Sequence, residues 1–230
     1  MKKKLLSILF ITTCALCITA CNIEDANNGT YTSTETTSKE KGSASIEIPS
    51  FSEEGLLTRE SENLLSGKYN IEIEFEEYGT VALTLDADLA PVTVTNFLDL
   101  VKDGFYNGLT LHRIISGFMI QGGDPLGQGF GGSGRSIQGE FAQNGVENNL
   151  AHTRGVISMA RSGDPNSASS QFFIMHQDAP HLDGAYAAFG QVTSGIEVVD
   201  AICKNTPVQD ANGTVKAADQ PKIKEIRIVK

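Results

Sequence analysis

The chain has 230 residues, a formal net charge of −10 and no tryptophan. This length accommodates one domain of about 150–170 residues with appended segments, and such a domain buries a core without needing metals or disulfides. The acidic balance argues against a nucleic-acid partner, which calls for a basic face, and against electrostatic adhesion to anionic lipid.

The first twenty residues have the pattern of an export signal. Lysines at positions 2–4 precede an apolar run over residues 5–20, which is short for a membrane-spanning helix. The run ends Ile18-Thr19-Ala20-Cys21, which resembles the lipobox of bacterial lipoproteins. We therefore predict a lipoprotein signal peptide over residues 1–20 and a lipidated Cys21. An uncleaved anchor and an ordinary secretory signal are the alternatives.

This interpretation also accounts for the four cysteines. Cys14 and Cys17 would leave with the signal peptide and Cys21 would carry lipid, so Cys203 would have no partner for an intramolecular disulfide. Cys203 falls at helical spacing with Ile196 and Val199. This spacing predicts a small buried hydrophobic residue, with a reactive thiol as the alternative.

Residues 21–67 are predicted to form a polar tether between the lipid and the domain. Residues 27–45 consist almost entirely of Asn, Gly, Ser, Thr, Glu and Lys, which cannot bury enough apolar surface to order a chain. As a flexible coil this segment would reach roughly 35–40 Å. The leucines at 56–57 and 64–65 allow one short helix within it.

Globular patterning begins at Lys68, so the domain is predicted to span residues 68–230. Polar and apolar residues alternate over 70–75 and again over 81–85, around a turn, which predicts a hairpin. Pro91 begins a helix whose apolar residues recur at i, i+3, i+4 and i+7 before Gly104 ends it. A second helix is predicted over about 195–204, and further short strands over 110–115, 118–121, 155–160, 171–175, 186–192 and 222–229. Many short strands with two helices favour a mostly β fold, a closed barrel capped by the helices.

Several chemistries are excluded by context. Residues 129–134 satisfy G-x-G-x-x-G, but no strand precedes them and no helix follows, so a dinucleotide site is not predicted. A glycine-dense loop that admits a peptide backbone fits better. The four histidines lack ligand spacing, and Ser169 and Ser170 lack a G-x-S-x-G context, so neither a metal nor a nucleophile is expected.

Motifs along residues 68–229 resemble the bacterial branch of the cyclophilins, which are peptidyl-prolyl cis/trans isomerases. They are Leu111-His112-Arg113-Ile114-Ile115, Phe118-Met119-Ile120-Gln121-Gly122-Gly123, the run from His152 to Arg161, Ser169-Ser170-Gln171-Phe172-Phe173-Ile174, Leu182-Asp183-Gly184 and Ala188-Phe189-Gly190. The resemblance implies a closed eight-stranded antiparallel β-barrel with two capping helices and a site on its outer surface.

The resemblance also implies residue roles. Arg113 would be the catalytic arginine, and Gln121 would orient it and the substrate. Phe118, Met119, Phe173 and Leu182 would hold the proline ring, while Ala160, Arg161 and Gln171 would line the peptide groove. His181 stands where many eukaryotic members have Trp and Tyr186 where they have His, and both are expected to contact ligand. Without the motifs, Arg113 would be interpreted as a surface or ion-paired group and the apolar residues as core.

The implied function is prolyl isomerisation without cofactor or metal. We expect a monomer that acts on unfolded or nascent exported polypeptides containing X–Pro bonds, with no nucleic-acid partner. It would be an extracytoplasmic lipoprotein of a bacterium, attached to the membrane through its lipid. The alternative is a non-catalytic cyclophilin-like domain that binds proline segments as a chaperone or adhesin.

Overall fold

The computed structural model describes residues 56–229. The predicted signal peptide, Cys21 and most of the predicted tether lie outside the described residues. Within residues 56–229 no helix is long and apolar enough to cross a membrane.

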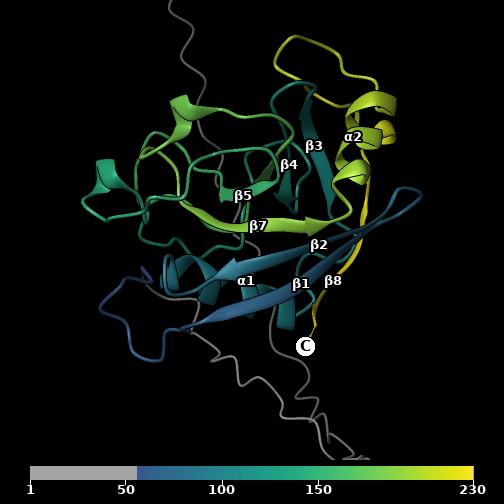
Figure 1. The fold of residues 1–230 in the computed structure, drawn as a ribbon. Coiled ribbons are helices and arrows are strands. Elements are labelled where there is room, and N and C mark those ends of the chain that lie inside the picture. The colour runs from purple at the N-terminus through teal and green to yellow at the C-terminus, as the bar shows by residue number, and fades with distance from the viewer. Residues whose placement is uncertain (1–55, 230) are drawn as a thin grey trace, which may run out of the picture. The chain divides into compact units, whose positions relative to one another are not determined.

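Eight antiparallel strands form one curled sheet (Figure 1). The order across the sheet is β3-β4-β6-β5-β7-β2-β1-β8. The strands are β1 (Lys68–Phe75), β2 (Gly79–Asp86), β3 (Thr110–Ile115), β4 (Met119–Asp124), β5 (Val156–Met159), β6 (Phe172–Met175), β7 (Ala188–Ser194) and β8 (Ile223–Val229). The mostly β prediction and the predicted hairpin of β1 and β2 are therefore confirmed.

The prediction of a closed barrel is wrong. The edge strands β3 and β8 meet at one end only, where an isolated bridge between Thr110 and Lys222 is flanked by backbone hydrogen bonds between residues 108–111 and residues 221–223. Beyond this bridge, residues 212–215 occupy the free edge of β3: Ile114 N–H donates to the Gly213 carbonyl and Val215 N–H donates to the His112 carbonyl. The sheet is an open, curled half-barrel because this loop takes the hydrogen bonds that β8 would need to close it.

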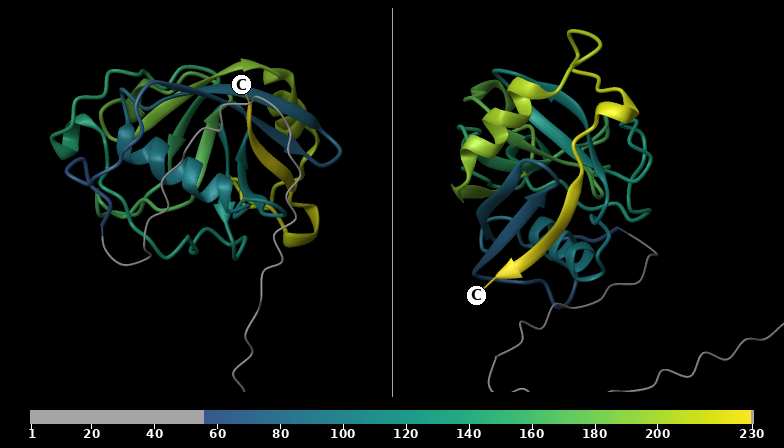
Figure 2. Two further views of the ribbon diagram at one scale, coloured as in Figure 1. Left: turned by 90° about the horizontal axis from the view of Figure 1, so that it is seen from below. Right: turned by 90° about the vertical axis from the view of Figure 1, so that its right-hand side faces the viewer.

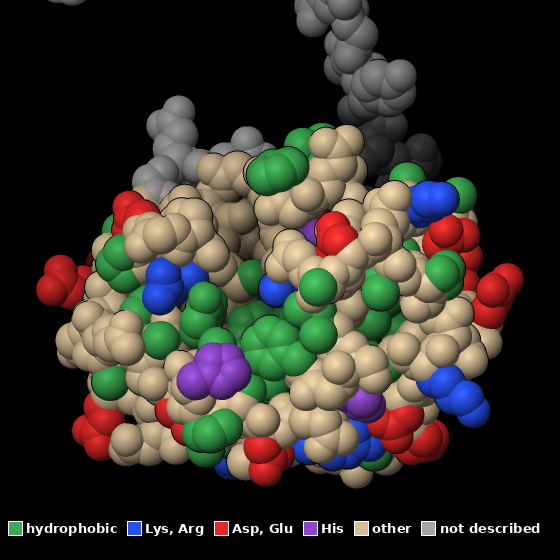
Figure 3. All heavy atoms as spheres, turned by 90° about the horizontal axis from the view of Figure 1, so that it is seen from above, with side chains coloured by type: hydrophobic (Ala, Val, Ile, Leu, Met, Phe, Trp, Pro, Cys, Tyr) green, Lys and Arg blue, Asp and Glu red, His purple; other side chains and the backbone are tan. Residues whose placement is uncertain are grey.

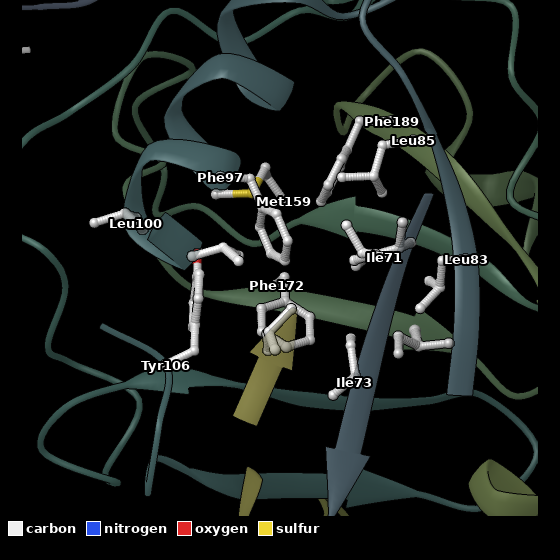
Figure 4. Packing of buried hydrophobic residues seen from close by; sticks show 14 of the residues in the cluster. Ile71, Ile73, Leu83, Leu85, Phe97, Leu100, Tyr106, Met159, Phe172 and Phe189 are labelled. Atoms are coloured by element: carbon white, nitrogen blue, oxygen red, sulfur yellow. The ribbon is translucent and has the colours of Figure 1, made fainter. Parts of the chain in front are cut away.

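Two α-helices, α1 (Pro91–Lys102) and α2 (Ile196–Asn205), lie at separate places on the curled sheet (Figure 2). Helix α1 begins at Pro91, whose missing N–H is harmless in a first turn. Its Phe97 lies 5.6 Å from Phe172 and 5.0 Å from Tyr106, ring centroid to centroid, and all three side chains are fully buried in the core (Figure 4). In α2, Cys203 is buried as predicted.

Residues 56–67, which precede β1 and the predicted boundary at residue 68, pack against the domain. Leu57 N–H donates to the Ser136 carbonyl, and the Leu57 carbonyl accepts from Gln138 N–H. Leu57 and Leu65 are both buried in the core, and residues 56–67 contain turns and a bridge but no helix. These leucines provide apolar surface that fixes residues 56–67 against the domain.

Candidate active site

One face of the domain is hollowed, with hydrophobic side chains on its floor and cationic and histidine side chains at its rim (Figure 3). A pocket of about 150 Å³ contains nine lining residues, all of them predicted site residues. They are Arg113, Phe118, Met119, Gln121, Ala160, Arg161, Phe173, Leu182 and Tyr186. The other two residues predicted to contact substrate lie beside it: Gln171 lines the adjoining hollow and His181 stacks on Phe118.

Neighbouring strands bring the polar and apolar groups of this pocket together. Arg113 of β3 lies opposite Gln121 of β4, and Gln121 lies opposite Phe173 of β6. Side chains directly opposite each other on antiparallel strands are about 5 Å apart at Cβ. The pairing of β3, β4 and β6 therefore places a cation, an amide and an aromatic ring in one row.

The guanidinium of Arg113 is held on both sides. Its Nη1 donates to Gln121 Oε1 at 3.2 Å, its Nε donates to the Asn212 carbonyl at 2.9 Å, and its Nη2 donates to Asn212 Oδ1 at 3.1 Å. Among the described residues no carboxylate forms an ion pair with it, although Asp210 contributes a favourable field. Burial lowers the pKa of Arg113, but an arginine remains charged at physiological pH. The site thus presents a fixed cation without a neutralising partner.

A chain of amides continues from this cation. Gln121 Nε2 donates to Gln171 Oε1 at 3.0 Å, and Gln171 Nε2 donates to the Gly131 carbonyl at 2.8 Å. Because each amide has one oxygen and one NH₂, these bonds fix which end of Gln121 faces Arg113. Gln171 therefore orients Gln121, and Gln121 orients the guanidinium.

The apolar part of the pocket is preformed. Met119, Phe173 and Leu182 are each less than 10% exposed, so the pocket opens over side chains that are already packed. The Tyr186 ring meets Phe173 edge to face, with centroids 5.8 Å apart. His181 is exposed and stacks on Phe118 at 5.7 Å, which places it outside the lining, on the outer side of the wall.

Arg161 lies between two aromatic rings at the end of the pocket. Its guanidinium carbon is 4.8 Å from the centroid of Tyr186 and 5.0 Å from that of Phe141. Its Nε and Nη2 both donate to the Ala185 carbonyl. The side chain therefore fixes the loop that carries Tyr186 and adds a second cation to the pocket.

A larger hollow of about 410 Å³ adjoins the pocket and shares Gln121, Ala160 and Arg161 with it, so the two form one continuous groove. Gln171 lines this hollow together with Gly129, Phe130, Gly131, Gly132, Gly134, Ser136, Ser162, Ser167 and Ser169. Apart from Phe130, Arg161 and the two glutamines, the lining is polar backbone and small side chains, which suits an extended peptide.

Asp124 organises the glycine loop of this groove. Its carboxylate accepts hydrogen bonds from the backbone N–H groups of residues 126, 128, 129 and 130. Burial would raise the pKa of Asp124, but these donors outweigh it and hold the pKa below its usual range. A Cβ at Gly131 would overlap Asp124 Oδ1, so this position requires glycine.

The sequence matches the family model described as cyclophilin type peptidyl-prolyl cis-trans isomerase/CLD over residues 70–230. The chain belongs to this family. A peptidyl-prolyl cis-trans isomerase of Helicobacter pylori is 48% identical over 126 residues, which are 54% of this chain and 74% of that protein. One of Synechococcus elongatus is 50% identical over 115 residues, 50% of this chain and 74% of that protein.

A solved structure supports the same assignment. The crystal structure of a cyclophilin-type isomerase from Cryptosporidium parvum has a TM-score of 0.63 and 33% identity, and the match covers 71% of this chain and 99% of that one. The activity class of this cyclophilin-type isomerase, and its eight antiparallel strands with two helices, therefore agree with what its motifs imply, whereas barrel closure does not.

Sequence reasoning missed two contributors to the isomerase site. Asn212 holds Arg113 from 99 positions away, within a polar loop that carries no pattern. Asp124 was also missed, although a carboxylate immediately before a glycine-dense loop is a signal that could have identified it. Both act through hydrogen bonds to or from the backbone, which side-chain motifs do not reveal.

Proposed function

We propose that this cyclophilin-type isomerase rotates X–Pro bonds in unfolded or nascent exported polypeptides, outside the cytoplasm of a bacterium, while lipidated Cys21 anchors it to a membrane. The observation that carries the catalytic part is the fixed guanidinium of Arg113 beside an apolar pocket of about 150 Å³. The volume and lining suit a proline ring.

The proposed mechanism follows from the peptide bond. Rotation about C–N requires about 18–20 kcal/mol because resonance must be broken. In the twisted transition state the proline nitrogen becomes pyramidal and regains a lone pair. Arg113 donates a hydrogen bond to that lone pair, and it has little to bind in the planar ground state, so the stabilisation is differential.

The remaining pocket residues hold the substrate during rotation. Phe118, Met119, Phe173 and Leu182 fix the ring while the acyl side turns, and Gln121 keeps Arg113 aimed at the nitrogen. The pocket lining contains no thiol, carboxylate or aliphatic hydroxyl. A rotation that needs no covalent intermediate and no proton exchange is consistent with such a lining.

Arg113→Ala tests the catalytic proposal. We expect kcat/KM in a protease-coupled prolyl-peptide assay to fall by about 100- to 1000-fold, which is roughly 3–4 kcal/mol of transition-state stabilisation. Arg113→Lys should recover little, because a point charge does not reproduce the planar fork. Arg227→Ala, which removes an arginine from the distant β8, is the control. Near-normal turnover in folded Arg113→Ala would overturn the mechanism, and peptide binding without turnover in the wild type would favour a non-catalytic chaperone.

The anchoring and export are supported by the lysines, apolar run and Cys21 of the first 21 residues. A diacylglyceryl group supplies two chains, which is enough for stable anchoring where one chain would be marginal. We expect Cys21→Ala to lose metabolic labelling by a fatty-acid probe and to leave the membrane fraction, whereas the matched control Cys17→Ala should keep both. Label retained in Cys21→Ala would exclude this anchor without affecting the catalytic proposal.

A further inference from the structure

His152 is a buried histidine that touches two sides of the proline pocket without lining it. Its side chain is 1% exposed. It precedes β5, and the mechanism above does not use it. Its contacts nevertheless reach both the segment that carries Leu182 and the strand that carries Phe173.

The first set of contacts holds the wall of the pocket. The short 3₁₀ helix Pro180–Leu182 is fixed at its start, where Ala179 N–H donates to the His152 carbonyl at 2.8 Å. It is fixed again just past its end, where Asp183 Oδ1 accepts from His152 N–H at 2.7 Å and from the ring at 2.9 Å. His152 therefore brackets the turn that presents Leu182.

The second set of contacts reaches the floor of the pocket. The imidazole stacks on the Phe173 ring, with centroids 6.0 Å apart and planes inclined by 19°. Its Nε2 lies 3.1 Å from Ser158 Oγ, and Ser158 is paired with Phe173 across β5 and β6. One side chain thus connects the wall at Leu182 to the floor at Phe173.

The proton on the ring is fixed by its neighbours. The pKa of Asp183 is lowered, chiefly by the N–H of His152, so its carboxylate is ionised and can only accept. Nδ1 therefore carries the hydrogen, and Nε2 accepts from the Ser158 hydroxyl. Burial lowers the pKa of His152, which favours this neutral ring.

Asp183, His152 and Ser158 are the residue types of a hydrolytic triad, but their placement excludes that role. Ser158 is fully buried and does not line the pocket, so no substrate carbonyl can reach its hydroxyl. The role of these three residues is therefore structural.

We propose that His152 is a positioning residue that sets the separation between Leu182 and Phe173, and hence the fit of the pocket to a proline ring. This inference rests on the proposed function of that pocket. Both walls contact the ring in the ground state and in the transition state. Loosening these walls therefore weakens the binding of the substrate and of the transition state equally, which raises KM and leaves kcat nearly unchanged.

Two variants test the inference from opposite ends of the hydrogen-bonded chain. His152→Phe keeps a ring against Phe173 and removes both ring hydrogen bonds. Asp183→Ala acts from a residue whose side chain is 38% exposed, so it removes the bond to the ring with little risk to folding. We expect each to raise KM about 5- to 20-fold with kcat within about twofold.

The conservative variant and a matched control separate positioning from general destabilisation. Asp183→Asn keeps an acceptor oxygen for both His152 donors, so its KM should stay within about twofold of the wild type. Val199→Ala opens a cavity at a fully buried position of α2 away from the pocket. It should lower the urea midpoint and reduce apparent kcat only through the folded fraction, with KM unchanged.

The dissociation constant of succinyl-Ala-Ala-Pro-Phe-anilide, measured by NMR titration, provides a readout independent of turnover. It should weaken in His152→Phe and Asp183→Ala by the same factor as KM, and Asp183→Asn should restore it. If both variants bind the peptide as the wild type does, the inference is overturned even where the wild type turns over. Absence of turnover in the wild type would refute the proposed function instead.

Discussion

Replacing Arg135 by Met should destabilise the domain by about 3–5 kcal/mol, because it leaves a buried carboxylate without its partner. Arg135 Nη2 lies 3.0 Å from Asp99 Oδ2, and both side chains are less than 10% exposed. Arg135 also donates through Nε and Nη2 to Asn96 Oδ1, at 3.1 and 2.9 Å. The pair joins the loop that enters the groove at Ser136 to helix α1.

The expected change is large enough to measure by two methods. For a domain of 150–250 residues, each kcal/mol shifts the melting temperature by about 2–4 °C, so Arg135→Met should lower it by roughly 6–20 °C. Urea unfolding followed by far-ultraviolet circular dichroism should show a lower midpoint at an unchanged slope. Lys68→Met removes an exposed ion pair to Asp86 and should leave the midpoint nearly unchanged.

The double variant Arg135→Met/Asp99→Leu distinguishes the cost of an unpaired charge from the loss of an attraction. Apolar residues of similar volume often replace a buried ion pair with little loss, so the double variant should be more stable than either single one. Our reasoning would be refuted by an Arg135→Met protein within about 1 kcal/mol of the wild type, or by a double variant as unstable as the sum of the single variants.

Three shorter predictions follow from other buried or charged groups. Burial, with a smaller contribution from Asp200, raises the pKa of the Cys203 thiol to about 12, so it should resist alkylation at pH 8 in the folded protein and react in urea. Burial lowers the pKa of His112 and of His152 below its usual value, so protonation favours the unfolded chain once the pH falls below about 6.5. The urea midpoint should therefore be highest above about pH 6.5 and fall as the pH drops below it, and it should fall less in His112→Phe. The pocket lining has two arginines and no carboxylate, so peptides with Glu before Pro should exceed those with Lys in kcat/KM by about 2- to 5-fold at low salt, and Arg161→Gln should reduce that ratio.

The elements that the sequence predicts best are those with one buried face. Alternation in β1 matches its burial, with Ile71, Ile73 and Phe75 inside and the residues between them partly exposed. The apolar spacing in α1 likewise identifies Phe97 and Leu98 as core. Periodicity succeeds here because it depends only on residues within the element.

Polar burial is invisible to the same reasoning. Thr93, Asn96 and Asp99 are as buried as the apolar face of α1, because a loop some 40 residues later in the chain wraps over them. The prediction of a closed barrel is wrong for a similar reason. Whether β8 or residues 212–215 pair with the edge of β3 depends on how a loop packs. Neither the burial of these polar side chains nor the pairing at the edge of β3 leaves a pattern in the local sequence.

In the active site, too, the sequence predicts some residues and not others. Motif resemblance identifies all nine residues that line the pocket, since these side chains are the ones that would face a ligand. It does not identify Asn212, which holds Arg113, or His152, which holds the turn before Asp183. Residues that orient other residues act through hydrogen bonds that several residue types could make, so their identity is a weaker signal.

The two halves of the groove are built differently, and their construction determines what each can recognise. The pocket stands on the paired strands β3, β4 and β6, whose ladder fixes Arg113, Gln121 and Phe173 relative to one another. The adjoining hollow is lined mostly by backbone and small side chains, and its glycine loop is ordered by the carboxylate of Asp124. A fixed, apolar pocket discriminates strongly by shape, whereas a glycine-rich surface offers the backbone of any residue a similar approach. We therefore expect this isomerase to be strict for proline and more permissive for the residues on either side of it.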